Sequence, residues 1–157
     1  MNGAWACAHL VDSYRFTGDR EDLKKSLPIL ESNARFIMSW FEDDGEGRHL
    51  SGPGVSPETG FYAPDGTGPN VLSYVSNGAS HDQLLGRESL RNYIYACGEL
   101  GVQTPTLLKA VQFLRKIPQP AIGPDGRVQE WRQPFEEMQK GHRLSLIHIS
   151  EPTRHSL

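Results

Sequence analysis

The chain has 157 residues, with 16 Lys and Arg against 19 Asp and Glu and a net charge of −3 at pH 7. This length suits about one domain, and a hydrophobic content of 37% is enough for a packed core. The scattered basic residues argue against a nucleic-acid or anionic-membrane surface, and no apolar run reaches the roughly 18 residues of a membrane span. Cys7 and Cys97 lie in apolar helical patterns and are predicted to be buried free thiols. The six His show no zinc-ligand spacing with them, so no metal or cofactor is predicted.

Two antiparallel helices joined by a tight turn are predicted at the start of the chain. The first, over residues 3–16, is indicated by an apolar stripe of about three-residue spacing: Trp5, Ala8, Val11 and Tyr14. Gly18 fits the left-handed cap that ends this helix, and Asp19 fits the N-cap of the next one. The second stretch, residues 20–41, contains Pro28, which is expected to kink or split it. Its apolar stripe is Leu30, Ala34, Ile37 and Phe41.

The segment of residues 43–77 is rich in Gly, Pro, Asp and Ser. A connection of this length inside a compact domain is usually functional or disordered. It is predicted to be a long loop with short strands near residues 48–50 and 71–75.

Helical pattern resumes over residues 80–100 and stops at Gly101. Thr104-Pro105 predicts the start of a further helix, since a capping Thr precedes Pro at the first helical position. The apolar residues of this helix are Leu108, Val111 and Leu114, and it ends before Pro118. Residues 121–131 are predicted to form a small hairpin.

These elements predict an all-α fold of about four helices with long loops and a small hairpin. Helix pairs with loops gathered at one end indicate part of an (α/α)6 toroid. A free four-helix bundle is the structural alternative.

The end of the chain is expected to have a different origin from the rest. Residues 144–154 read Leu-Ser-Leu-Ile-His-Ile-Ser-Glu-Pro-Thr-Arg, which resembles the translation of a transposase adaptor used in sequencing libraries. We therefore expect residues 1–143 to be part of a catalytic domain and residues 144–157 to be a foreign tail. The alternation of apolar and polar residues over 144–149 also fits a genuine β-strand.

Several motifs occur together, in order, over residues 3–143. They are Gly3-Ala4-Trp5 with His9, Tyr14-Arg15-Phe16-Thr17-Gly18-Asp19, Ser56-Pro57-Glu58, Asp82-Gln83-Leu84, Gln129-Glu130-Trp131 and Gly141-His142-Arg143. This set resembles glycoside hydrolase family 95. The resemblance implies an (α/α)6 barrel that hydrolyses terminal α-L-fucosides with inversion, and in some members α-L-galactosides.

Inverting hydrolysis needs a carboxylic acid on one face of the sugar and a base that activates water on the other. The resemblance makes Glu58 the general acid; from the sequence alone, a Glu in a Pro- and Gly-rich loop is also a solvated side chain. Thr59 stands where the family usually has Asn. The water-activating Asn and Asp residues of the family correspond to regions upstream and downstream of this segment. The chain alone is therefore expected to be inactive.

Three further residues are candidates for contacting the substrate. Trp5 can stack on a sugar face, and it equally fits a core position on an amphipathic helix. His142 belongs to what resembles a longer His-rich family motif, which here stops after Arg143. Asp82 fits the lining of a pocket, and it equally fits an acidic residue favoured by the helix dipole.

A fucosylated oligosaccharide or glycan is the expected partner, with no nucleic acid and no membrane. Two other functions stay open: a different α/α-toroid glycosidase, such as an α-L-galactosidase, and a non-catalytic helical interaction module. Members of the family often act outside the cytoplasm, in the periplasm or after secretion. The first residues show no secretory signal, so the compartment is left open.

Overall fold

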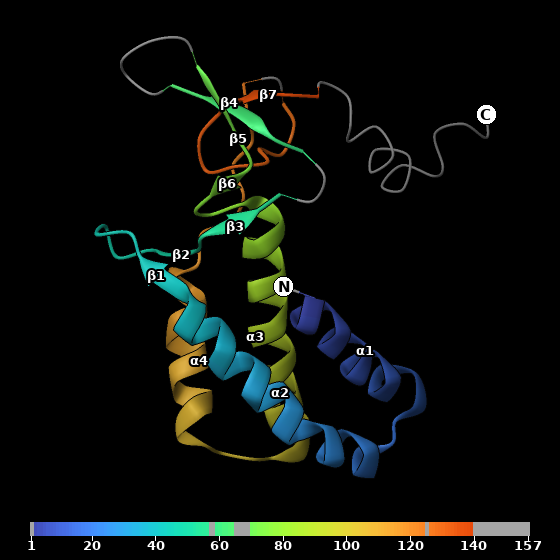
Figure 1. Ribbon diagram of the computed structural model, residues 1–157. Helices are drawn as coiled ribbons and strands as arrows, with labels where there is room; N and C mark the ends of the chain where they lie inside the picture. Colours follow the sequence, from blue (N-terminus) through green and yellow to red (C-terminus); the bar gives the residue numbers. More distant parts are fainter. Residues whose placement is uncertain (1, 57–58, 65–69, 125, 140–157) are drawn as a thin grey trace, which may run out of the picture.

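The computed structural model describes residues 2–56, 59–64, 70–124 and 126–139. Four helices lie within these residues and form one layer of the molecule (Figure 1). They are α1 (Asn2–Thr17), α2 (Arg20–Trp40), α3 (Ser80–Leu100) and α4 (Pro105–Lys116). The predicted set of four helices is confirmed. Within the described ranges, no helix combines the length and the apolarity that a membrane crossing needs.

The helix ends form where the sequence predicts them. Gly18 takes a φ of 69° after α1, and the Asp19 carboxylate caps α2 by accepting from the amides of Glu21 and Asp22 at 2.9 and 3.0 Å. Gly101 ends α3 in the left-handed conformation. The Thr104 hydroxyl accepts from the Leu107 amide at 3.0 Å and begins α4. The Asp19 and Thr104 side chains thereby accept from backbone amides that a helix N-terminus leaves without a partner.

Of the two effects expected of Pro28, a kink or a split, the split does not occur, because α2 continues through the proline. A proline inside a helix costs about 3 kcal/mol. The helix buries Leu23 before the proline and Leu30 and Ile37 after it. Burial of each such side chain contributes about 1.5–3 kcal/mol, which is enough to hold both halves in one helix.

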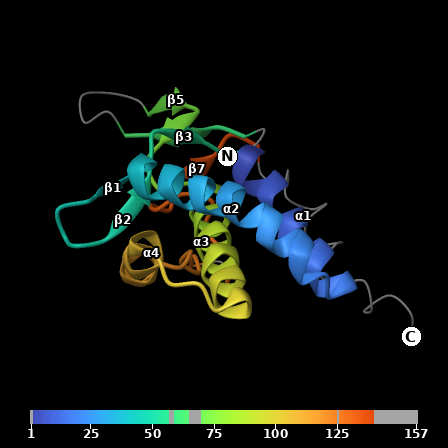
Figure 2. The same ribbon diagram turned by 90° about the horizontal axis from the view of Figure 1, so that it is seen from below.

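The core lies between the four helices, and α3 contacts each of the other three. Seen from below, α2 passes across α3, with α4 on one side and α1 on the other (Figure 2). The fully buried side chains of this core are Val11, Leu23, Leu30, Ala34, Ile37, Leu90, Tyr93, Ala96, Cys97, Ala110 and Ile117. Both cysteines are free, as predicted; Cys97 is buried, whereas Cys7 is only half-buried.

In two of the predicted apolar stripes, one residue faces solvent while its neighbour in the sequence is buried. Trp5 and Leu108 are each 64% exposed, whereas their neighbours Ala4 and Leu107 are buried. Adjacent residues of an α-helix are separated by about 100° around the axis. A one-residue error therefore turns a side chain from the core toward solvent.

Seven short strands lie mainly between α2 and α3, at one end of the helical layer (Figure 1). They are β1 (Phe41–Asp43), β2 (His49–Ser51), β3 (Gly54–Val55), β4 (Phe61–Ala63), β5 (Val71–Ser73), β6 (Val75–Ser76) and β7 (Glu136–Glu137). They pair antiparallel as β1-β2, β3-β6 and β5-β4-β7. The predicted strands near 48–50 and 71–75 are confirmed. The hairpin at 121–131 forms around one bridge, Ile122 to Val128.

Asp44 organises the turn between β1 and β2. Its carboxylate accepts from Arg48 Nε at 2.8 Å and from the amides of Glu46 and Arg48 at 2.9 and 3.1 Å, and Arg132 Nη2 lies 3.1 Å away. Burial by itself raises the pKa of Asp44, but the hydrogen bonds from Arg48 and the two amides outweigh it and lower the pKa to about 2. The folded state therefore favours the ionised carboxylate.

This environment predicts an acid-dependent contribution of Asp44 to stability. Because its folded pKa lies below the ordinary 3.8, the contribution is complete above pH 3.8 and is lost as the pH falls toward 2. Asp44→Asn should be less stable than the parent at pH 7 and lose less on acidification. Urea unfolding at pH 7, 4 and 2.5 measures this, with the exposed Asp22→Asn variant as control. Parallel pH profiles of Asp44→Asn and the parent would contradict the prediction.

Candidate active-site loop

The candidate acid Glu58 and its neighbour Pro57 lie outside the described residues, but the residues on either side are placed. Ser56 and Thr59 are 3% and 4% exposed. The Thr59 amide donates to the Ser56 carbonyl at 3.5 Å. The Ser56 hydroxyl also donates to the Glu130 carboxylate. Both ends of the Pro57-Glu58 segment are thus anchored in the strand layer.

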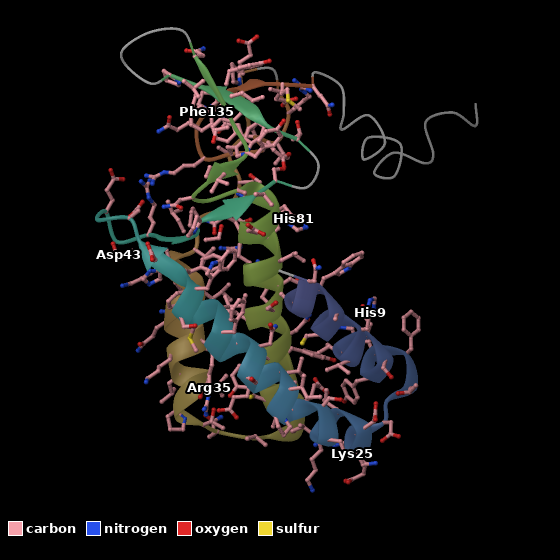
Figure 3. All side chains as sticks on the ribbon, viewed as in Figure 1. His9, Lys25, Arg35, Asp43, His81 and Phe135 are labelled. Carbon is pink, nitrogen blue, oxygen red and sulfur yellow. The ribbon has the colours of Figure 1, made fainter. Side chains whose placement is uncertain are left out.

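An aromatic cluster supports this loop. The Phe61 ring lies 4.8 Å from Trp131 and stacks on Phe135 at 4.4 Å, with 14° between the ring planes. Phe61 belongs to β4, which pairs with β7 through Phe61 opposite Glu137. The expected long loop is therefore packed against the C-terminal part of the described chain, and Figure 3 shows Phe135 within that layer.

The start of α3 contacts residues 129 and 130, which precede Trp131 of the aromatic cluster. The Ser80 amide donates to the Glu130 carbonyl at 2.8 Å, and the Ser80 hydroxyl donates to the Gln129 carbonyl. Glu130 is consequently fixed through its backbone at α3 and through its side chain at Ser56. The sequence motif Gln129-Glu130-Trp131 marked this region, but its contacts with Ser56 and Ser80 join residues about 50 to 75 positions apart and are invisible to local patterns.

Asp82 lies beside the loop and is only 4% exposed. It stands in the first turn of α3, and its Oδ1 is 3.3 Å from His81 Nδ1. A side chain at Gly54 would overlap Asp82 Oδ2, so the carboxylate packs directly against β3. Asp82 therefore stands in the first turn of a helix and is also buried against Gly54, which precedes Ser56 by two positions. A contact with substrate stays a prediction.

The other two candidates are not brought to this loop by the described structure. Trp5 is 64% exposed, so the alternative of a core position is wrong, and its stacking on a sugar stays a prediction. His142 lies outside the described residues. Within the described ranges, no three His, Cys, Asp or Glu side chains converge in a way that would hold a metal ion.

The close approach of Asp82 to Gly54 yields a testable expectation. Gly54→Ala should destabilise the chain by about 1–3 kcal/mol, because the added methyl group must displace a buried carboxylate. Gly98→Ala is the matched control: a Cβ there meets no atom within 4 Å, and Ala favours a helix over Gly by up to about 1 kcal/mol. Thermal and urea unfolding measure both variants. Equal stability of Gly54→Ala and the parent would show that Asp82 is free to move.

Comparison with known proteins identifies the class of enzyme to which this loop belongs. The sequence profile of the Glycosyl hydrolase family 95 catalytic domain matches residues 1–151. The Alpha-L-fucosidase 2 of Arabidopsis thaliana is 34% identical over 145 residues, which are 91% of this chain. Both matches are glycoside hydrolases. The chain belongs to family 95 of these enzymes, which confirms the resemblance drawn from its motifs.

The chain spans 17% of the length of that relative. The profile match ends at residue 151, inside the segment expected to be foreign. The boundary between residues 143 and 144 therefore stays a prediction, and residues 140–157 are not described by the structure.

Proposed function

We propose that the chain is part of an inverting glycoside hydrolase that removes terminal α-L-fucosyl residues from glycans. The observation that carries this proposal is the family 95 match over residues 1–151, which includes the Ser56-Pro57-Glu58 motif. The 34% identity to an α-L-fucosidase favours fucose as the sugar that is released. Glu58 is the proposed general acid.

The surroundings of the loop support this role. General acid catalysis needs a carboxyl group held in a fixed position beside the leaving oxygen. Ser56 and Thr59 are buried on either side of the proposed acid, and Glu130 holds Ser56 from the hairpin. The described residues next to the proposed acid are thus packed and hydrogen-bonded, unlike those of a fully solvated loop.

The water-activating side of the reaction is proposed to come from other parts of a longer protein, so that the 157-residue chain alone is inactive.

For the fold, we propose a partial (α/α)6 toroid. Trp5, Ile29 and Phe36 are exposed on α1 and α2, and the apolar surface of these two helices is the kind that further helices cover. Residues 144–157 are proposed to lie outside the catalytic domain.

Hydrolysis of a panel of oligosaccharides by the full-length protein tests the function. We expect release of L-fucose from fucosylated oligosaccharides, with the β-anomer appearing first in NMR spectra because inversion changes the configuration. Preferential release of L-galactose would favour the α-L-galactosidase alternative. Hydrolysis of neither substrate would favour a non-catalytic helical module. Initial release of α-L-fucose would contradict inversion.

A further inference from the structure

An open cleft of about 720 Å³ lies between α2 and α4, on the helical layer and away from the candidate active-site loop. Residues 35, 38 and 39 of α2 form one wall, and residues 105, 106, 109, 112, 113 and 116 of α4 form the other. His49 of β2 closes one end. Figure 3 shows Arg35 in this region.

The charged side chains lining the cleft are all basic: Arg35, Lys109 and Lys116. Arg35 donates to Glu31 at 2.7 Å and to the Thr106 hydroxyl at 3.3 Å, so it is partly neutralised and fixed at the start of α4. Among the described residues, Lys109 and Lys116 lie within 4 Å of no carboxylate in the recorded ion pairs. Two positive charges of the cleft are thus available to a ligand.

These charges are spaced along the cleft. Thr106, which fixes Arg35, and Lys116 are ten residues apart on α4, or about 15 Å at a rise of 1.5 Å per residue. Lys109 lies one turn from Thr106 on the same side of the helix. A single small anion can contact only one of these lysines, whereas an extended ligand with several negative groups can contact both.

The far end of the cleft offers an aromatic contact. The His49 ring stacks on Phe113 with 4.0 Å between the centroids and 13° between the planes. His49 Nδ1 is buried without a hydrogen-bond partner among the described atoms. Burial, followed by the nearby Lys116, lowers the pKa of His49, while Asp43 and Asp44 act in the opposite direction. A negative group bound beside Lys116 therefore faces an imidazole that it would help to protonate.

We propose that this cleft binds a short oligosaccharide that carries carboxylate or sulfate groups. The negative groups pair with Lys109 and Lys116, and the sugar rings contact the Phe113 side of the cleft. The choice of a saccharide over another polyanion rests on the proposed hydrolase function, and binding of a nucleic acid is an outcome of the test below. The cleft would then hold acidic glycans at a place separate from the hydrolytic loop.

Binding of a galacturonate trisaccharide, a sulfated trisaccharide and an uncharged galactose trisaccharide to the complete chain tests the proposal. The charged ligands should shift the NMR signals of the cleft residues and raise the pKa of His49, and their binding should weaken as salt screens the charges. The double variant Lys109→Gln/Lys116→Gln should bind them at least about tenfold more weakly, as expected for the loss of charge-assisted contacts. Lys24→Gln/Lys25→Gln, which removes two exposed charges near the start of α2, is the matched control and should bind like the parent.

Four outcomes would overturn the proposal. The galactose trisaccharide could bind as tightly as its charged counterparts, or both double variants could lose affinity equally. Competition by inorganic sulfate at the same concentration would show an adventitious ion only, and tighter binding of a short single-stranded RNA would identify a nucleic-acid surface. Because these measurements do not involve Glu58, their failure is distinct from a failure to hydrolyse fucosides.

Discussion

Glu58→Gln in the full-length enzyme is expected to lower the rate of hydrolysis of a fucosylated oligosaccharide by about 10²–10⁴-fold, the usual contribution of a positioned general acid. Glutamine keeps the shape of the side chain but has no acidic proton to donate. The sugar alcohol that leaves is a poor leaving group, so its departure depends on that proton. Steady-state kinetics on the natural oligosaccharide measure the loss.

An activated aryl fucoside provides an internal comparison for the same variant. Its leaving oxygen needs little protonation, so Glu58→Gln should slow its hydrolysis far less. Glu42→Gln, at an exposed position on β1, is the control for a lost carboxylate and should leave both rates unchanged. If Glu58→Gln stayed within a few-fold of the parent on the natural substrate, another residue would be the acid.

Leu107→Ala should reduce the free energy of unfolding by about 2–4 kcal/mol, whereas Leu108→Ala should change it by less than about 0.5 kcal/mol. The two leucines are adjacent on α4, yet Leu107 is 8% exposed and packs in the core while Leu108 is 64% exposed. Truncating Leu107 leaves a cavity between α4 and its neighbours. Truncating Leu108 removes only solvated surface.

Urea unfolding of the two variants tests the packing of α4, since the sequence pattern listed Leu108 and not Leu107 among the apolar residues of this helix. Helix propensity is not a confounding factor, because both substitutions replace Leu by Ala in the same helix. A larger loss for Leu108→Ala would mean that α4 is rotated by about one residue relative to the described packing.

The helix boundaries could be predicted because their signals are local. Asp19, Gly101 and Thr104-Pro105 act on backbone groups within four residues. Which residue of a stripe faces the core depends on the neighbouring helices, so the pattern chose Trp5 over Ala4. The continuity of α2 through Pro28 is likewise decided by packing and not by the proline itself.

The candidate loop likewise combines a local motif, which the sequence reveals, with long-range contacts, which it does not. Ser56-Pro57-Glu58 was recognisable as a motif, whereas the contacts that hold it are long-range. The link from Ser56 to Glu130 spans 74 positions, and the pairing of β4 with β7 joins Phe61 to Glu137. No periodicity within a window of some 18 residues contains such information. The burial of Asp82 also follows from the close approach of β3 at Gly54, which only the folded chain reveals.

The strand layer begins where α2 ends and returns to the core where α3 begins, at the same end of the helical layer (Figure 1). A segment whose two ends lie on one side of a packed body can grow or shrink without threading through that body. Each doubling of such a connection costs only about 0.6 kcal/mol in chain entropy. An engineer could therefore change the length of the connection between Ala63 and Val71 while keeping the Ser56-Pro57-Glu58 motif and the four helices, provided that Phe61 still contacts Trp131 in the hairpin.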